Sequence, residues 1–242
     1  EIVKLNIKSQ NLAAKASEEL SEKGVVIIED FIDSATCEEL IALLQGDQLE
    51  NSNDLTFVHM RDARFFSNAV AESKAAFDTV TSNSIREIAT SYLKQPFRLK
   101  CHRVYSTKSG YNFPWHTDNK YDNDKNEANG IVAIIYLVDT LNGATEFVLG
   151  SHKFSEDFKL NNYTDDFIQS NYSDKVRATA ARAGSVVISD IRTIHRGSVS
   201  KNGPIDRYSF WFQLDCSLEK AERLLLNPEF LPNKIPDDLS FY

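Results

Sequence analysis

Three side chains able to bind a metal ion stand out in the sequence, although they are far apart. His116 and Asp118 are separated by one residue, and side chains two positions apart on an extended backbone point to the same face. His195 lies much further along the chain, in a segment rich in β-branched residues. Two imidazoles and one carboxylate form the ligand set of non-haem iron(II), whose open positions take a co-substrate and dioxygen. The structural alternatives are a hydrogen-bonded turn for the His-x-Asp triplet and a buried core position for His195.

Arg207 is the fourth candidate, because it opens a hydrophobic segment that covers residues 207–214. Strand alternation puts Ser209, Trp211 and Gln213 on the same face as this arginine. A buried guanidinium needs an anionic partner, and its planar fork matches a carboxylate, to which the Ser209 hydroxyl adds a donor. The distal carboxylate of 2-oxoglutarate fits such a site, and an internal Asp or Glu is the alternative partner. Trp211 and Gln213 are the candidates for contacts with a substrate.

The second half of the sequence has the pattern of a β-rich fold that would position these residues. Apolar, β-branched segments separated by turn signals such as Asn142-Gly143 predict strands. The predicted strands cover residues 98–107, 130–138, 145–149, 185–189, 194–199 and 207–214. We expect a mainly β fold with flanking helices, in which the strands form a double-sheet jelly roll.

The first 96 residues are expected to be a helical preamble around one strand at residues 24–31. Helix formers predict a helix at residues 11–23, which ends at the glycine that follows. Asp33 is a suitable cap for a second helix, and a longer helix is predicted at residues 74–93.

The remaining segments complete one predicted domain, residues 1–242. Its jelly-roll core covers residues 97–215 and contains a polar insertion at residues 153–182, which we expect to act as a lid. A tail at residues 216–242 is expected to begin with a helix at residues 217–226.

The composition limits the class of protein. The 242 residues carry a net charge of −8, from 27 basic and 35 acidic residues, which argues against nucleic acid as a general partner. No apolar run approaches the roughly 18–20 residues of a membrane-spanning helix, and no targeting segment is visible at the start. Cys37, Cys101 and Cys216 are odd in number and widely spaced, so we expect reduced structural thiols in a cytoplasmic protein.

The order of these motifs resembles the phytanoyl-CoA hydroxylase-like branch of the iron(II)/2-oxoglutarate-dependent dioxygenases. Trp-His-Thr-Asp at residues 115–118 is similar to the family's Trp-His-x-Asp. Residues 131–153 are similar to its strand, Asn-Gly turn and Gly-Ser-His-Lys segment, with Leu149 where the family commonly has proline. Residues 183–197 and 206–210 resemble the segments with its distal histidine and its co-substrate arginine.

The resemblance implies a double-stranded β-helix core, which is a cupin-like jelly roll. It implies that His116, Asp118 and His195 bind Fe(II), and that Arg207 binds 2-oxoglutarate with help from Ser209. A further polar contact is expected from the strand before the His-x-Asp triplet, where Tyr105 is the first choice and His102 the second.

The activity that the resemblance implies is oxidation of a small metabolite. With O2 and 2-oxoglutarate, such an enzyme hydroxylates or otherwise oxidises an aliphatic C–H bond and releases succinate and CO2. Because Asp118 is present, halogenation is not expected. The alternatives are a non-enzymatic jelly-roll protein that binds a small molecule, and a metal-dependent jelly-roll isomerase. In each case the expected partner is a small molecule, with no nucleic acid or membrane, and the oligomeric state is open.

Overall fold

The computed structural model describes residues 1–45, 57–60, 63–108, 114–118, 129–154, 163–198, 206–216 and 227–231, and the strands of this part of the chain form two sheets. The larger sheet consists, in spatial order, of β1 (Lys4–Asn6), β2 (Val25–Glu29), β9 (Val186–Asp190), β6 (Gly130–Tyr136), β11 (Asp206–Asp215), β5 (Arg98–Lys108), β4 (Ala63–Phe66) and β3 (Phe57–Met60). The smaller sheet consists of β10 (His195–Gly197), β7 (Thr145–Val148) and β8 (Val176–Ala178). Neighbouring strands are antiparallel in both sheets, except that β1 and β2 are parallel.

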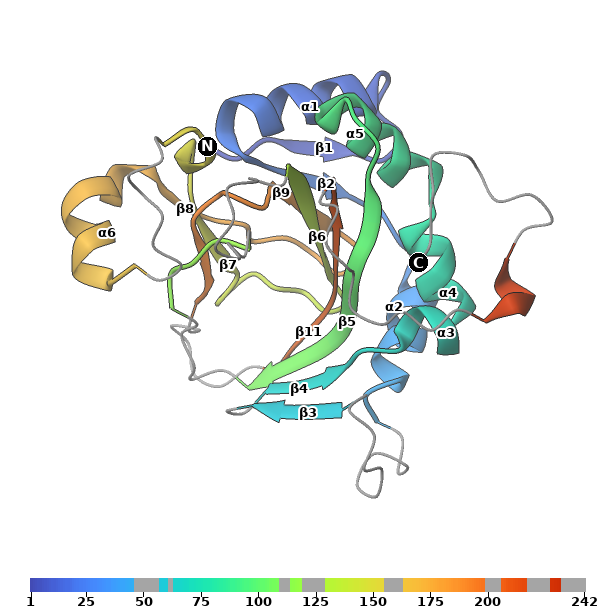
Figure 1. The fold of residues 1–242 in the computed structure, drawn as a ribbon. Coiled ribbons are helices and arrows are strands. Elements are labelled where there is room, and N and C mark those ends of the chain that lie inside the picture. The colour runs from blue at the N-terminus through green and yellow to red at the C-terminus, as the bar shows by residue number, and fades with distance from the viewer. Residues whose placement is uncertain are drawn as a thin grey trace.

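Helices flank the sheets on both sides (Figure 1). The α-helices are α1 (Leu12–Lys23), α2 (Ser34–Ala42), α3 (Ala69–Glu72), α4 (Lys74–Val80), α5 (Asn83–Leu93) and α6 (Asp165–Tyr172). Short 3-10 helices are η2 (Ser151–Lys153), η4 (Ser173–Lys175) and η5 (Pro228–Phe230). Residues of α1 to α5 pack on one face of the larger sheet, whereas α6 lies beside the smaller sheet.

The central strands of the larger sheet are buried on both faces, because each face is covered by its own layer. Ile131 and Ile135 of β6 pack in a cluster with helix residues such as Leu20. The alternate residue Ile134 packs instead with Phe147 of the smaller sheet. This stacking of two sheets, with helices outside them, is the predicted jelly roll.

The inner face of β11 is the face that carries Arg207, Ser209, Trp211 and Gln213. Trp211 packs against the cluster that contains Phe147, so this face is turned towards the smaller sheet. The intervening residues of β11 face the helices. The tertiary fold therefore directs the candidate residues of β11 into the space between the sheets.

Gly24 joins α1 to β2 and is required for two reasons. Its φ of 79° lies in the left-handed region, and its N–H bonds to the carbonyl of Leu20, which ends the helix. A Cβ at this position would come within 2.5 Å of both His152 Nδ1 and Thr193 Oγ1. The predicted helix, its glycine stop and the strand that follows are thus confirmed.

The first 96 residues contain more β-structure than the sequence predicts, so the prediction of a single strand there is wrong. β2 is the expected strand, but β1 pairs alongside it, and β4 and β3 extend the sheet beyond β5. β1 has only 3 residues and β4 only 4, too short for a periodic signal. Each of these strands is stabilised by pairing with another strand of the sheet.

The single helix predicted at residues 74–93 is wrong in one respect, because it is two helices, α4 and α5. Ser82 caps the second, and its hydroxyl accepts a hydrogen bond from the N–H of Ile85 at 3.5 Å. Serine in a short break competes with the helix for backbone hydrogen bonds, which explains the interruption.

The other predicted strands agree with the structure to within a few residues, as β5, β6, β7, β9, β10 and β11. Within the predicted insertion, the described residues supply α6 and the third strand of the smaller sheet, β8. Its action as a lid stays a prediction, and residues 155–162 lie outside the described part. The helix predicted at residues 217–226 also lies outside it.

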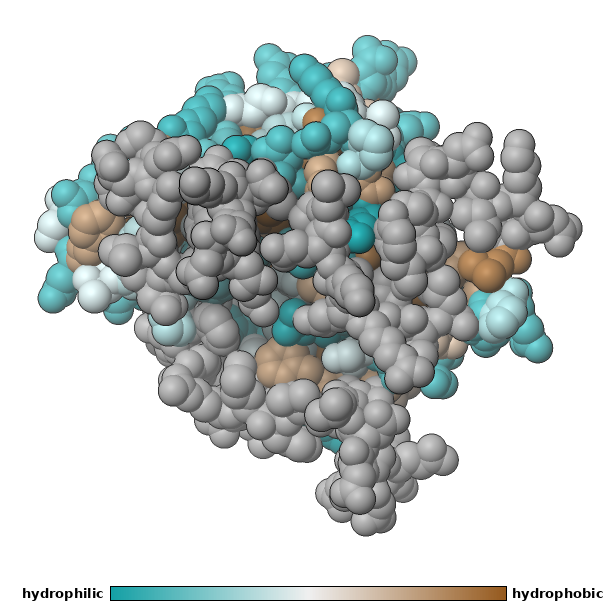
Figure 2. All heavy atoms as spheres, in the orientation of Figure 1, coloured by the Kyte–Doolittle hydropathy of each residue, from teal (hydrophilic) through white to brown (hydrophobic). Residues whose placement is uncertain are grey.

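Figure 2 shows a mainly hydrophilic surface over α1 and α5, at the top of the view. Within the described part of the chain, every helix is too short or too polar to span a bilayer. Within the described part of the chain no disulfide joins Cys37, Cys101 or Cys216, and Cys37 and Cys101 are buried.

Candidate metal centre

A backbone bridge brings the two candidate histidines together. The N–H of His116 donates to the carbonyl of His195 at 2.9 Å, and the reverse hydrogen bond has the same length. The imidazole ring centroids are 4.3 Å apart. Nearby, the N–H of Asp118 donates to the carbonyl of Ile191 at 2.8 Å. The predicted ligands thus converge through the antiparallel pairing of two distant segments.

The three side chains form a cluster of the size that a metal ion needs. One ligand atom from each of His116, Asp118 and His195 lies within 4.8 Å of the other two. Asp118 Oδ2 is 3.3 Å from Nε2 of His195, and Asp118 Oδ1 is 3.8 Å from Nε2 of His116. Metal bonds of about 2.1 Å at right angles place neighbouring ligand atoms roughly 3 Å apart. The Asp118 oxygens already lie near this spacing, and an ion would draw the three side chains closer together.

The hydrogen bonds of the imidazoles determine which nitrogen presents its lone pair to the cluster. His116 Nδ1 is 2.7 Å from the carbonyl oxygen of Pro114, and His195 Nδ1 is 2.9 Å from that of Thr193. A carbonyl only accepts, so each Nδ1 carries the hydrogen and each Nε2 lone pair points into the cluster. Asp118 Oδ2 is buried and has no hydrogen-bond partner in the described residues. This donor set fits a divalent transition metal.

Burial keeps His116 in the form that binds metal. Its pKa is lowered to about 4, first by burial and then by the neighbouring His195, while Asp118 opposes the change. At neutral pH the imidazole is therefore uncharged, as ligation requires. The Phe147 ring stacks on His195, with 5.3 Å between centroids, and fixes its plane.

A buried polar network supports the turn that holds Asp118. Asp190, at the end of β9, accepts from Nε and Nη2 of Arg192 at 2.9 and 2.7 Å, and from the Tyr92 hydroxyl at 2.6 Å. The turn contains Ile191, whose carbonyl accepts the Asp118 N–H. This network was not predicted from the sequence, although an Asp and an Arg two residues apart are a local signal for part of it.

Arg207 is partly buried, but its partners are not carboxylates. Its Nε donates to Thr107 Oγ1 at 3.0 Å, and its Nη1 donates to the carbonyls of Ser198, at 2.7 Å, and Gly143. Among the described residues, no Asp or Glu forms an ion pair with it and Nη2 forms no hydrogen bond. The internal acid that was the alternative partner is thus absent from this part of the chain.

Ser209 and Tyr105 lie beside Arg207. Ser209 pairs with Tyr105 of β5 on one side and with Tyr136 of β6 on the other, so the three share the inner face. Burial raises the pKa of Tyr105, while its hydrogen bond to Ser209 and the charge of Arg207 act in the opposite direction. The structure therefore places Arg207, Ser209 and Tyr105 together.

His102, the second choice from the same strand, faces the opposite side of the sheet. It is buried against Phe210, with 6.5 Å between ring centroids and the rings edge to face. It does not share the inner face with Tyr105, and its place as an alternative polar contact is wrong. Strand alternation alone separates these two residues.

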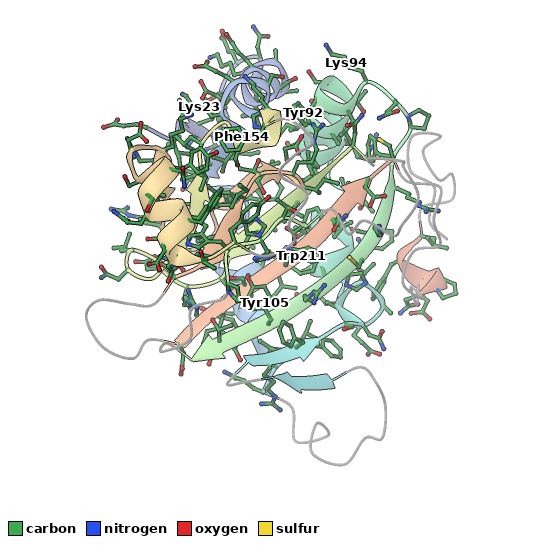
Figure 3. The ribbon with its side chains drawn as sticks, turned by 60° about the vertical axis from the view of Figure 1, so that its left-hand side comes forward. Lys23, Tyr92, Lys94, Tyr105, Phe154 and Trp211 are labelled. Carbon is green, nitrogen blue, oxygen red and sulfur yellow. The ribbon has the colours of Figure 1, made fainter. Side chains whose placement is uncertain are left out.

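The two predicted substrate contacts differ in their surroundings. Gln213 is buried, and its Nε2 donates to Asp215 at 3.0 Å. Trp211 is partly exposed, and Figure 3 shows it on β11 beside Tyr105 of β5. The Arg103 guanidinium, which the sequence analysis missed, lies 4.5 Å from the Trp211 ring centroid. Its position two residues before Tyr105 is the signal that could have identified it.

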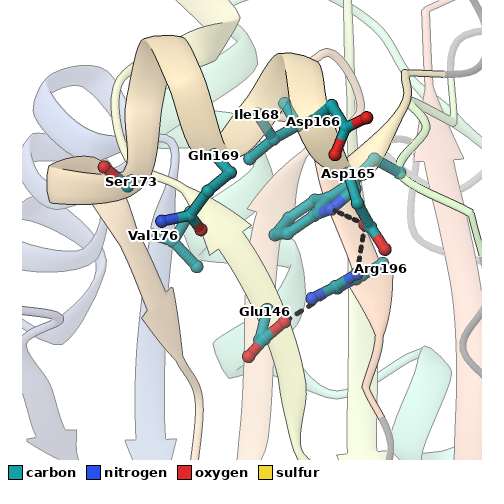
Figure 4. Close-up of a pocket in the computed structure, with 9 residues that line it drawn as sticks. Glu146, Asp165, Asp166, Ile168, Gln169, Ser173, Val176 and Arg196 are labelled. Carbon is teal, nitrogen blue, oxygen red and sulfur yellow. Dashed lines mark hydrogen bonds and ion pairs between the residues drawn. The ribbon is translucent and has the colours of Figure 1, made fainter.

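A separate cavity of about 490 Å³ lies between α6 and the smaller sheet (Figure 4). Trp115 and Arg196 line it, and each is the chain neighbour of a metal-centre histidine. Asp165 of α6 accepts from Trp115 Nε1 at 2.9 Å and from Arg196 Nη1 at 2.5 Å. Arg196 Nε also donates to Glu146 at 2.8 Å. These bonds brace both histidine segments from outside, and the cavity does not contain the cluster.

The comparison with protein families identifies the group to which the chain belongs. The family model described as phytanoyl-CoA dioxygenase (PhyH) matches residues 20–203, which include all three residues of the cluster. The chain belongs to this family. The resemblance predicted from the motifs is confirmed, while no curated protein matches the chain.

Solved structures confirm the fold. HygX from Streptomyces hygroscopicus with nickel, 2-oxoglutarate and hygromycin B bound is 16% identical, with a TM-score of 0.65 over 86% of this chain and 89% of that one. The epimerase SnoN in complex with Fe3+, alpha ketoglutarate and nogalamycin RO is 18% identical, with a TM-score of 0.66 over 94% and 93%. The carbocyclase SnoK from nogalamycin biosynthesis is 18% identical, with a TM-score of 0.63 over 85% and 84%. The jelly-roll core with flanking helices is common to these chains.

Proposed function

We propose that this protein is an iron(II)- and 2-oxoglutarate-dependent oxygenase that hydroxylates an aliphatic C–H bond of a small molecule. The observation that supports this most directly is the cluster of His116, Asp118 and His195. Both Nε2 atoms point to one place, where a carboxylate oxygen of Asp118 has no hydrogen-bond partner among the described residues. Membership of the PhyH family supports the same class of enzyme.

The inner face of β11 offers a site for the co-substrate. Nη2 of Arg207 forms no hydrogen bond among the described residues, and the hydroxyls of Ser209 and Tyr105 lie beside that arginine. A distal carboxylate can accept hydrogen bonds from all three groups. HygX and SnoN, which share the fold, contain 2-oxoglutarate or alpha ketoglutarate beside a metal ion.

The protein's own part in the reaction is to bind, orient and exclude water. When bound, iron(II) with 2-oxoglutarate and O2 supplies the oxidising power for C–H cleavage, with release of succinate and CO2. His116, Asp118 and His195 would hold the metal on one face and leave the other for the reactants. Trp211 borders this space, where it can contact a substrate.

A second outcome of the same chemistry is favoured by two relatives in structure. SnoN is described as an epimerase and SnoK as a carbocyclase. Cleavage of a C–H bond that leads to epimerisation, by return of a hydrogen to the other face, or to oxidative ring closure is therefore the second candidate. Product analysis by mass spectrometry separates the two, because hydroxylation adds one oxygen atom to the substrate.

Succinate production is the test of the proposed function. The purified protein with Fe(II), 2-oxoglutarate and O2 is expected to form succinate slowly without substrate and faster with a substrate from a metabolite library. Asp118→Ala should lower this rate by roughly 100-fold or more, because one metal ligand is lost. Asp78→Ala, which removes an exposed carboxylate of α4, is the matched control and should retain the rate.

Two results would contradict the proposal in different ways. If the protein binds neither Fe(II) nor Co(II), it is a non-enzymatic binding protein. If it binds metal but does not consume 2-oxoglutarate with any compound of the library, the metal-dependent isomerase is the better description.

A further inference from the structure

Arg103 is a cation on the inner side of β5 that forms no ion pair with any residue that the structure describes. Its Cα partner across the sheet is Trp211, which lies on the inner face of β11. The guanidinium lies 4.5 Å from the Trp211 ring centroid and 5.7 Å from that of Phe65. Two aromatic faces therefore hold the planar group and leave its edge of N–H donors free to bind a ligand.

The hydrogen-bonding capacity of Arg103 is not used by the residues that the structure describes. Its side chain is partly exposed, and it forms no hydrogen bond or ion pair within the part of the chain that the structure describes. Other cations of this face are engaged: Arg207 with backbone carbonyls, and Lys100 with the buried Asp215 at 3.3 Å. Arg103 is thus a donor held between two aromatic rings, with no acceptor among the described residues.

Arg103 lies next to the proposed co-substrate site. It is two residues from Tyr105 on β5, and its partner Trp211 is two residues from Ser209 on β11. Two residues along a strand span about 7 Å, so these pairs occupy adjacent rows of one face. The positive charge of Arg103 also acts on Tyr105, where it opposes the rise in pKa that burial causes.

We propose that the Arg103 guanidinium binds an anionic group of the substrate, a carboxylate or a phosphate, so that the enzyme oxidises acids in preference to neutral molecules. This inference rests on the proposed function, because it assigns the substrate to the space beside the metal centre. A charge-assisted, forked hydrogen bond in a partly desolvated site changes affinity by roughly 10- to 100-fold. The same surroundings disfavour cationic substrates.

The test uses pairs of ligands in which one member carries an anionic group and the other is neutral. Monocarboxylates are paired with their primary amides, such as hexanoate with hexanamide and benzoate with benzamide. Phosphate esters are paired with their parent alcohols. Each pair is titrated by calorimetry into protein loaded with Co(II) and 2-oxoglutarate, and the Fe(II) protein is assayed for succinate. For wild type we expect at least one acid to bind roughly 10-fold or more tightly than its neutral partner.

Variants of Arg103 assign that preference to this residue. Arg103→Gln should abolish the preference for acids, because it weakens binding of the acid and leaves binding of the neutral partner unchanged. Arg103→Lys should retain part of the preference. Arg177→Gln, at an exposed arginine of β8, is the matched control and should leave the preference unchanged. Thermal melting and Co(II) titration check that each variant folds and binds metal.

Three outcomes would overturn the inference and leave the proposed function intact. In the first, no acid of the panel binds wild type better than its neutral partner. In the second, Arg103→Gln keeps the preference. In the third, Arg103→Gln weakens the binding of 2-oxoglutarate as strongly as Arg207→Gln does, which would place Arg103 in the co-substrate site. Failure of the proposed function is distinct, because it shows as absence of succinate formation from wild-type protein with every compound.

Discussion

Mild acid should destabilise this fold through His102, a histidine that lies away from the metal centre. Its side chain is 3% exposed, and its Nδ1 has no hydrogen-bond partner among the described residues. Burial, and to a smaller extent the charge of Arg103, lowers the pKa of His102 to about 4. In the unfolded chain the value is about 6.5, so the unfolded state binds the proton more readily.

The size of the effect follows from these two pKa values. Above pH 7.5 both states are unprotonated and His102 contributes nothing to the pH dependence. As the pH falls below about 6.5, the unfolded state gains a proton that the folded state does not, and stability is lost until the pH reaches the folded pKa of about 4. Between pH 7.5 and pH 5 the loss of unfolding free energy is about 2 kcal/mol.

Urea unfolding of metal-free wild type and His102→Leu at both pH values measures this loss. The variant removes the titrating group and keeps a side chain of similar volume beside Phe210. His116 also has a lowered pKa of about 4 and adds its own acid sensitivity to both proteins, so the comparison isolates His102. The wild type should lose about 2 kcal/mol more than the variant between pH 7.5 and pH 5. Equal losses in the two proteins would refute the reasoning.

Two further predictions concern packing around the metal centre. Gly24→Ala should lower the free energy of unfolding by about 2 kcal/mol or more, because alanine is strained at this positive φ and its Cβ would lie 2.5 Å from His152 Nδ1. An unchanged urea midpoint would contradict this prediction. Tyr92→Phe should cost about 1.5–3 kcal/mol, the range for a hydrogen bond to a buried charge such as Asp190. Tyr92→Phe should also weaken Co(II) binding at least a few-fold, since the turn after Asp190 supports Asp118. Calorimetric titration measures this affinity. An unchanged affinity would show that the turn holds its shape without Tyr92.

The sequence by itself determined the class of fold and most of the strands. Segments such as residues 130–138 are continuous runs of β-branched residues, and their burial on both faces follows from that local pattern. The spacing of His116 and Asp118 is likewise local, because strand alternation alone directs both to one side. The prediction that Arg207 and Ser209 share one face depends on the same alternation of side chains along a strand.

Tertiary structure alone decided which distant residues meet. The bridge between His116 and His195 depends on two segments that pair across the fold, and no local pattern encodes their register. The short strand β4, which carries Phe65, forms because it pairs with β5 on one side and β3 on the other. Arg103 acquires its position over Trp211 from the same cross-strand register. Local periodicity predicts the direction in which a side chain points. The residue that the side chain contacts depends on long-range strand pairing, which only the folded chain provides.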